Sequence, residues 1–184
     1  SRRGGDKLGR WREIRMIRGF VSLVAAALLS VAAPAAAQTT PQPGLAIADV
    51  SAWIASKGGQ VEPVQRQGDQ VWITVRDGSL TWLMFFYGCQ ADVCGDVQYS
   101  ATFTSPTINP EALNVWNRDH RFLKAFQIPS EGEEVTAVVQ YDLLLQPGGV
   151  EQLNDPTSVW VGLLETFARH IGYLPPAEAA PPAQ

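Results

Sequence analysis

The stretch Leu80-Thr-Trp-Leu-Met-Phe-Phe-Tyr87 decides the fold of this chain. It is apolar at nearly every position, which predicts a central strand buried on both of its faces. The dipeptide Asp77-Gly78 just before it is typical of a tight hairpin turn. Residues 71–76 before the turn and residues 96–104 after the stretch alternate between apolar and polar side chains, as strands do. Neighbouring strands joined by short turns indicate an antiparallel sheet.

Apolar side chains at helical spacing predict three helices around these strands. The first begins at Leu45 and ends at the glycine pair 58–59. The second begins at residues 109–111 (Asn-Pro-Glu), where asparagine can cap the helix and proline suits its first turn. Leu113, Trp116, His120 and Leu123 are expected on one face of this helix. The third helix begins at residues 155–156 (Asp-Pro) and ends at Gly172.

Two more strands are predicted, a modest one over residues 61–67 and a long one over residues 133–145. The order is then helix, three or four antiparallel strands, helix, long strand and helix. This order is typical of an α+β fold. We therefore expect an antiparallel sheet of about five strands with helices packed on one face.

The 184 residues divide into four predicted parts. Residues 1–37 form an N-terminal extension with a signal peptide, and residues 38–44 form a linker. Residues 45–173 form the α+β domain, which has the size of a single domain. Residues 174–184 form a tail rich in proline and alanine, which has almost nothing to bury and is expected to be disordered.

The first of these parts has the pattern of an export signal. Residues 1–37 contain seven of the 14 Lys and Arg residues and two of the 18 acidic residues. An apolar run follows Arg18, and the small residues after Pro34 suit signal peptidase. We expect cleavage after Ala37 and a periplasmic or secreted product that has no stable membrane insertion. An uncleaved anchor is the alternative, because residues 19–37 are just long enough to span a bilayer.

The charge of the remaining chain bears on its partners. After residue 37 there are seven basic and 16 acidic residues. Nucleic acids are held mainly by clustered lysine and arginine. We therefore expect no nucleic-acid partner.

Cys89 and Cys94 are the two cysteines, and they lie at the predicted tip between two strands. An even pair in an exported protein argues for a disulfide. A thiol–disulfide redox pair is the alternative, although redox cysteines usually stand two residues apart at a helix N-terminus. A zinc site would need two more ligands, so we expect no metal and no cofactor.

Binding residues are sought first on the second helix. Asn114, Asn117 and Arg121 are spaced along one helical face, so they could bind a small ligand or a peptide backbone. Equally, they could serve as caps for strand ends or loop carbonyls. Trp72 lies on the more polar side of its strand and is a candidate surface contact. His120 stands beside Asp119, but neighbours on a helix point about 100° apart and form no dyad. We therefore name no catalytic residue.

Two motifs carry a family resemblance. One is Phe85-Phe86-Tyr87-Gly88-Cys89 with Cys94, and the other is Asn114-x-Trp-Asn117 followed by Arg121-Phe122. With the segments around residues 141–150 and the Trp160/Phe167 helix, they resemble the YbjN-domain family of bacterial proteins. The resemblance covers roughly residues 45–171. It implies a fold like that of type III secretion chaperones, a regulatory or chaperone-like role, and no enzymatic activity.

The resulting expectation is an exported, non-enzymatic module that binds a protein or peptide partner. Folds of this kind often pair through a sheet or helix face, which allows a homodimer. Two alternatives remain at this point: a thiol–disulfide redox protein that uses Cys89 and Cys94, and a small-ligand binder at the Asn114/Asn117/Arg121 helix face.

Overall fold

The computed structural model describes residues 43–106, 108–130 and 134–177. Its elements follow one another in a simple order, with a short 3-10 turn before the last helix. They are β1 (Leu45–Ala46), α1 (Ile47–Ser56), β2 (Gln60–Val61), β3 (Gln65–Gln67), β4 (Gln70–Asp77), β5 (Leu80–Gln90), β6 (Val93–Ser105), α2 (Pro110–Asp119), β7 (Lys124–Ile128), β8 (Val135–Leu144), η1 (Val150–Leu153) and α3 (Asn154–His170).

Three predicted parts lie wholly or mainly outside the described residues. They are the leader over residues 1–37, most of the linker over residues 38–44, and the end of the tail over residues 174–184. At the start of that tail, the Leu174 N–H donates to the Ala168 oxygen at 3.0 Å. The side chain of Leu174 packs against the core.

All strands belong to one antiparallel sheet, whose order is β2-β4-β5-β6-β8-β7. β1 pairs with β6, and β3 pairs with β4. The α+β class and the antiparallel sheet are confirmed, but the sheet has eight strands rather than about five. The expected strand over residues 61–67 is divided into β2 and β3, and Pro63 lies between them. Proline cannot donate a backbone hydrogen bond to a partner strand.

The second helix starts where expected and ends earlier. The Ala112 N–H donates to the Asn109 side-chain oxygen at 2.8 Å, as an N-cap requires. The helix ends at Asp119, His120 is extended, and Phe122 has a φ of +73°. The expectation that Leu123 belongs to the helical face is therefore wrong. Leu123 is nevertheless buried, because the chain turns back and its oxygen accepts the Trp116 indole N–H at 3.1 Å.

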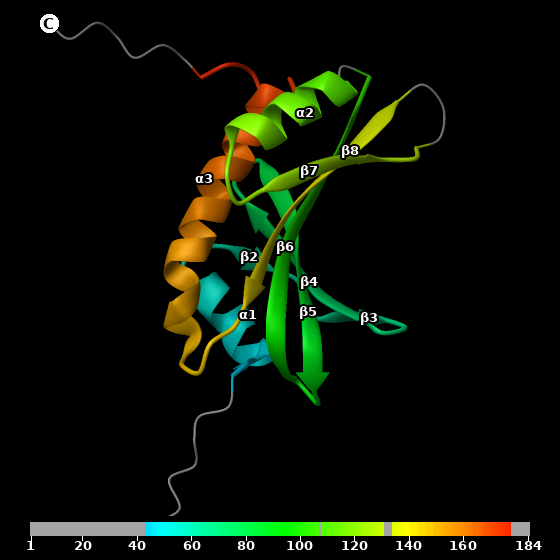
Figure 1. Cartoon of the computed structure of the whole chain (residues 1–184). Coiled ribbons are helices and arrows are strands. Elements are labelled where there is room, and N and C mark those ends of the chain that lie inside the picture. The colour runs from blue at the N-terminus through cyan, green and yellow to red at the C-terminus, as the bar shows by residue number, and fades with distance from the viewer. Residues whose placement is uncertain (1–42, 107, 131–133, 178–184) are drawn as a thin grey trace, which may run out of the picture. The chain divides into compact units, whose positions relative to one another are not determined.

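All three helices lie on the same side of the sheet (Figure 1). Trp82, Met84 and Phe86 of β5 point to this side and are buried. The expected alternation over residues 96–104 is confirmed, because the inward residues of β6 are buried there as well. The expectation that β5 is buried on both faces is wrong. Its alternate residues Leu83, Phe85 and Tyr87 keep exposed surface on the face that no helix of the described chain covers.

The last helix closes the core over the centre of the sheet. Trp160 and Phe167 are fully buried, and the Trp160 ring lies 5.6 Å from Tyr99 and 6.2 Å from Trp82. The helix ends before Gly172, whose φ is +76°, as the sequence predicts. Among the described helices, none has the length and apolar character needed to cross a membrane.

Candidate binding surface

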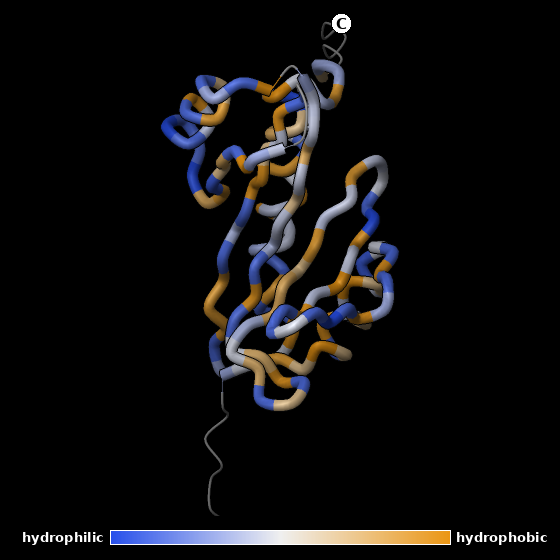
Figure 2. Tube along the Cα trace, turned by 90° about the vertical axis from the view of Figure 1, so that its right-hand side faces the viewer, coloured by the Kyte–Doolittle hydropathy of each residue, from blue (hydrophilic) through white to orange (hydrophobic). Residues whose placement is uncertain are grey.

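The sheet face that points away from the helices, here called the free face, carries aromatic side chains in contact. Strand pairing places Trp72 opposite Phe85, and their ring centroids are 5.9 Å apart. The Phe85 ring stacks at 6.5 Å on Tyr87, two residues farther along β5. Figure 2 views the molecule from this side, and apolar and polar segments alternate along the strands. Side chains of alternate residues share a face, so the three rings form one continuous row.

Leu144 extends this row across the sheet. It pairs with Asp96, which in turn pairs with Tyr87. Leu144 is 72% exposed and Tyr87 is 41% exposed, although both are large apolar side chains. We call Trp72, Phe85, Tyr87 and Leu144 the free-face patch. Asp96 lies between Tyr87 and Leu144, and exposed apolar side chains gathered on one face in this way often mark an interaction site.

A row of polar side chains crosses the free face beside this patch. The Gln98 amide donates to Asp142, and the Lys124 ammonium donates to the same carboxylate at 2.8 Å. The Tyr87 hydroxyl is 3.5 Å from the Gln98 oxygen. The row thus joins β5, β6, β8 and β7, and it places one compensated ion pair beside the aromatic rings.

The electrostatics of this row follow from its hydrogen bonds. Desolvation by burial disfavours the charged form of Asp142, but the hydrogen bonds from Lys124 and Gln98 hold the pKa of its carboxyl below the ordinary value. Burial and the charge of Asp142 raise the pKa of Tyr87, against the opposing charge of Lys124. Asp142 therefore remains a carboxylate at neutral pH, and Tyr87 remains a neutral hydrogen-bond donor.

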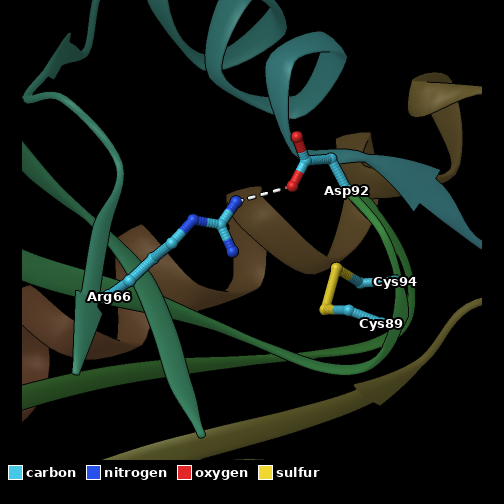
Figure 3. The surroundings of a disulfide bond; sticks show 4 residues. All are labelled: Arg66, Cys89, Asp92 and Cys94. Carbon is cyan, nitrogen blue, oxygen red and sulfur yellow. Dashed lines mark hydrogen bonds and ion pairs between the residues drawn. A yellow bond between two sulfur atoms is a disulfide. The ribbon is translucent and has the colours of Figure 1, made fainter. Parts of the chain in front are cut away.

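The tip of the β5–β6 hairpin adjoins the patch and carries the two cysteines (Figure 3). Cys89 and Cys94 pair across the strands, and their sulfur atoms are 2.12 Å apart, so they form a disulfide. The Arg66 guanidinium contacts Asp92 in the turn at 2.6 Å. The Ile47 N–H donates to the Asp92 oxygen at 2.9 Å. The tip is thus fixed by a covalent bond, an ion pair and a backbone contact.

This setting differs from that of a redox pair. Cys94 is fully buried, and both cysteines lie within strands rather than at a helix N-terminus. Reactive thiols usually lie in exposed, electropositive surroundings. The geometry therefore favours a structural bond over thiol exchange.

The structure separates the three residues proposed for the second helix. Asn117 donates to the Ala125 oxygen and accepts from the Ala125 N–H, each at 2.8 Å, so it binds β7. Asn114 is exposed. Arg121 lies beyond the end of α2, where its guanidinium is 4.9 Å from the Phe122 ring. The three residues do not share one helical face, because the helix ends at Asp119.

The two histidines lie together near the ends of α2 and α3. His120 stacks on Trp116 at 3.8 Å, and the His170 ring is 6.3 Å from His120. The His170 Nε2 is 2.8 Å from the Ala112 oxygen. Within the described parts of the chain, no group of three or more His, Cys, Asp and Glu side chains could hold a metal ion. The histidines here join one helix to the other.

The comparison with protein families agrees with the resemblance noted in the sequence. The family model YbjN, described as "Putative bacterial sensory transduction regulator", matches residues 46–172. The chain belongs to the YbjN family. Among solved structures, the crystal structure of YbjN from E. coli, called "a putative transcription regulator", matches at 14% identity and a TM-score of 0.38. The match covers 65% of this chain and 81% of that one. The comparison with curated proteins found no match.

The sequence identified only part of the surface found in this YbjN-family domain. Trp72 was expected as a surface contact, and it lies in the free-face patch. Phe85 and Tyr87 were missed because the unbroken apolar run from residue 80 to 87 predicts burial on both faces. Leu83, Phe85 and Tyr87 are spaced two residues apart, so they share one face of the strand, and this spacing was the available signal. Leu144 was missed because it ends an otherwise regular strand.

Proposed function

We propose that this YbjN-family domain is a non-enzymatic binding module with a regulatory or chaperone-like role, and that it engages a protein or peptide through the free face of its sheet. The observation that carries the proposal is the free-face patch, which has aromatic surface that no described helix covers. Aromatic anchors beside a polar rim are typical of protein interfaces. The family's regulator description fits such a role.

The patch suits an apolar segment of a partner. Tyr87 and Leu144 offer exposed apolar surface, and Gln98 lies between their strands as a hydrogen-bonding group. Lys124 and Asp142 neutralise each other, whereas Asp96, between Tyr87 and Leu144, has no ion pair in the described chain, so the apolar surface surrounds one carboxylate. A second copy of this chain is one partner that meets these requirements.

The test is capture by the full mature chain and by a variant. The oxidised protein is immobilised and exposed to envelope extract from its own cells, and bound proteins are identified by mass spectrometry. The double variant Tyr87→Ser/Leu144→Ser should lose the bound partner and keep its unfolding temperature. The control Val64→Ser removes an exposed apolar side chain from the β2–β3 loop and should bind as the native protein does.

Self-association is measured in parallel by light scattering. A dimer that the double variant abolishes identifies the partner as a second copy. If the native protein and the double variant capture the same proteins and have the same mass in solution, the free face is not the binding surface.

We also propose that the chain is exported to the periplasm or the medium and cleaved after Ala37. The basic leader, its apolar run and its small residues support this proposal, and so does the disulfide, since such bonds persist in oxidising compartments. Intact mass should show a chain that begins at Gln38, and alkylation should find no free thiol. A full-length cytosolic product with both thiols alkylated contradicts export.

A further inference from the structure

The second feature that points to a ligand is a cavity on the helical side of the sheet, remote from the free face. It lies between α1, the end of β4, β5 and the start of α3, and its volume is about 290 Å³. A second cavity of about 260 Å³ shares Asp77, Trp82 and Val161 with it. The first is close to the lower limit of the volumes that hold small ligands.

The cavity has an apolar wall with two indoles. Trp53 and Trp82 line it together with Ile54, Val75 and Val161. Trp53 is 6% exposed and Trp82 is 2% exposed, and neither indole N–H has a hydrogen-bond partner in the described chain. Buried donors without partners are rare and costly.

Most polar groups that line the cavity are already used. The Thr157 hydroxyl is 2.8 Å from the Tyr99 hydroxyl, and the Ser158 hydroxyl donates to the Asn154 oxygen. Lys57 and Asp77 differ, because neither has an ion pair or a side-chain hydrogen bond within the part of the chain that the structure describes. Both residues are exposed, so the cavity is lined by one solvent-accessible charge of each sign that has no ion-pair partner in the described chain.

The two charges come from neighbouring segments that line the cavity. Gln60 pairs with Arg76, so the chain entering β2 from Lys57 runs alongside Asp77. The Lys57 ammonium is held 5.4 Å from the Trp53 ring centroid, over the apolar wall. Lys57 and Asp77 thus line the same cavity but do not form a direct ion pair.

We propose that this cavity binds a small zwitterion with an apolar body, the chemical class of free apolar amino acids. The ligand carboxylate meets Lys57, its ammonium meets Asp77, and its side chain packs between Trp53 and Trp82. The proposal is independent of partner binding at the free face, because it uses residues on the other side of the sheet.

The test is a titration of the full mature chain with L-phenylalanine and L-leucine, followed through the indole N–H resonances of Trp53 and Trp82. At least one amino acid should cause saturable shifts with a dissociation constant near or below about 1 mM. Lys57→Gln and Asp77→Asn should each weaken binding at least tenfold, as about 1.4 kcal/mol of lost interaction would.

Two analogues and two control variants complete the design. 3-Phenylpropionate lacks the ammonium and phenethylamine lacks the carboxylate, so both should bind at least tenfold more weakly than phenylalanine. The exposed residues Asp69 and Arg118 supply charge-matched controls, and Asp69→Asn and Arg118→Gln should bind as the native chain does. The proposal is overturned if neither amino acid shifts the indoles at 10 mM (about tenfold above the expected constant), or if the single-charge analogues bind equally well.

Discussion

Tyr99 shows how one side chain links the sheet to the helices. Its ring is fully buried, stacks on Tyr141 at 5.9 Å and lies 5.6 Å from Trp160. Its hydroxyl and that of Thr157 in α3 form a hydrogen bond of 2.8 Å. Burial raises the pKa of Tyr99 to about 12, although the bond to Thr157 favours the charged form. The folded core therefore favours the protonated, neutral form of Tyr99.

This shift predicts a loss of stability in alkali. Between pH 10 and about 12 the unfolded chain loses the Tyr99 proton while the folded chain keeps it. The free energy of unfolding should therefore fall as pH rises through this range, by about 1.4 kcal/mol per unit from this group. Below pH 10 both states hold the proton, and the group contributes no pH dependence. Urea unfolding at pH 9, 10 and 11 measures the slope.

The control is Tyr99→Phe, which keeps the ring and removes the titrating group. It should cost about 1 kcal/mol at neutral pH through loss of the bond to Thr157. Its unfolding free energy should then decline less steeply above pH 10 than that of the native chain. Equal slopes for both proteins would show that Tyr99 does not cause the alkaline loss.

At the scale of elements, Asn117 joins α2 to β7. Its amide makes both a donor and an acceptor bond to the buried Ala125, at an edge strand whose other neighbour is β8. This explains why a five-residue strand is held after a helix that ends abruptly at Asp119. The asparagine supplies the hydrogen bonds that a further strand would otherwise make.

Substitution Asn117→Ala should lower the free energy of unfolding by about 2 kcal/mol, because it leaves two buried backbone groups unpaired. Asn114→Ala, on the same helix and equally exposed but without a side-chain hydrogen bond in the described chain, should change it by less than about 0.5 kcal/mol. Urea unfolding of the two variants tests the difference. Equal losses would contradict a specific role for Asn117 in holding β7.

The disulfide acts on a single structural element, because it closes the β5–β6 hairpin. The cysteines have a sequence separation of 5, and closing a loop of this length contributes about 2 kcal/mol on the chain-entropy relation. The double variant Cys89→Ala/Cys94→Ala should lose about this much, and reductant should have no further effect on it. Native protein in reductant should show the same loss.

A reduction potential below about −300 mV is expected for a structural bond, whereas a value near −200 mV would support redox exchange.

At the scale of the whole domain, one continuous core joins the three helices to a single side of the sheet. The ring centroid of Phe167 in α3 lies 5.6 Å from that of Phe103 in the sheet and 5.0 Å from that of Trp116 in α2. A side chain of α3 that contacts both the sheet and α2 couples the unfolding of these three elements. The domain is therefore expected to unfold in one cooperative step.

Substitution Phe167→Ala should cost about 3–5 kcal/mol through the cavity it leaves. Phe126→Ala, at a half-exposed position on the free face, should cost less than about 1.5 kcal/mol. Tryptophan fluorescence and far-ultraviolet circular dichroism should give coincident unfolding curves for the native chain. Separate curves would show that the helices and the sheet unfold independently.

Particular residues show which features of the fold the sequence predicts and which depend on tertiary packing. Alternation along β6 and the caps at Asn109 and Gly172 depend on local chemistry, so the pattern was sufficient to predict them. β7 could not be found in this way, because the positive φ of Phe122 and the Asn117 bond are imposed by tertiary packing. The free-face patch depends on which side of the sheet the helices cover, and no local pattern determines that.

The pairing of β1 with β6 has a consequence for the start of the domain. Leu45 pairs with Cys94, so the first strand of the described chain pairs directly with the disulfide hairpin. Opening the sulfur–sulfur bond should loosen that segment before anything else, and the Ile47 amide, bonded to Asp92, should then exchange with deuterium sooner. The exchange rate of the Ile47 amide would thus report the oxidation state of the hairpin.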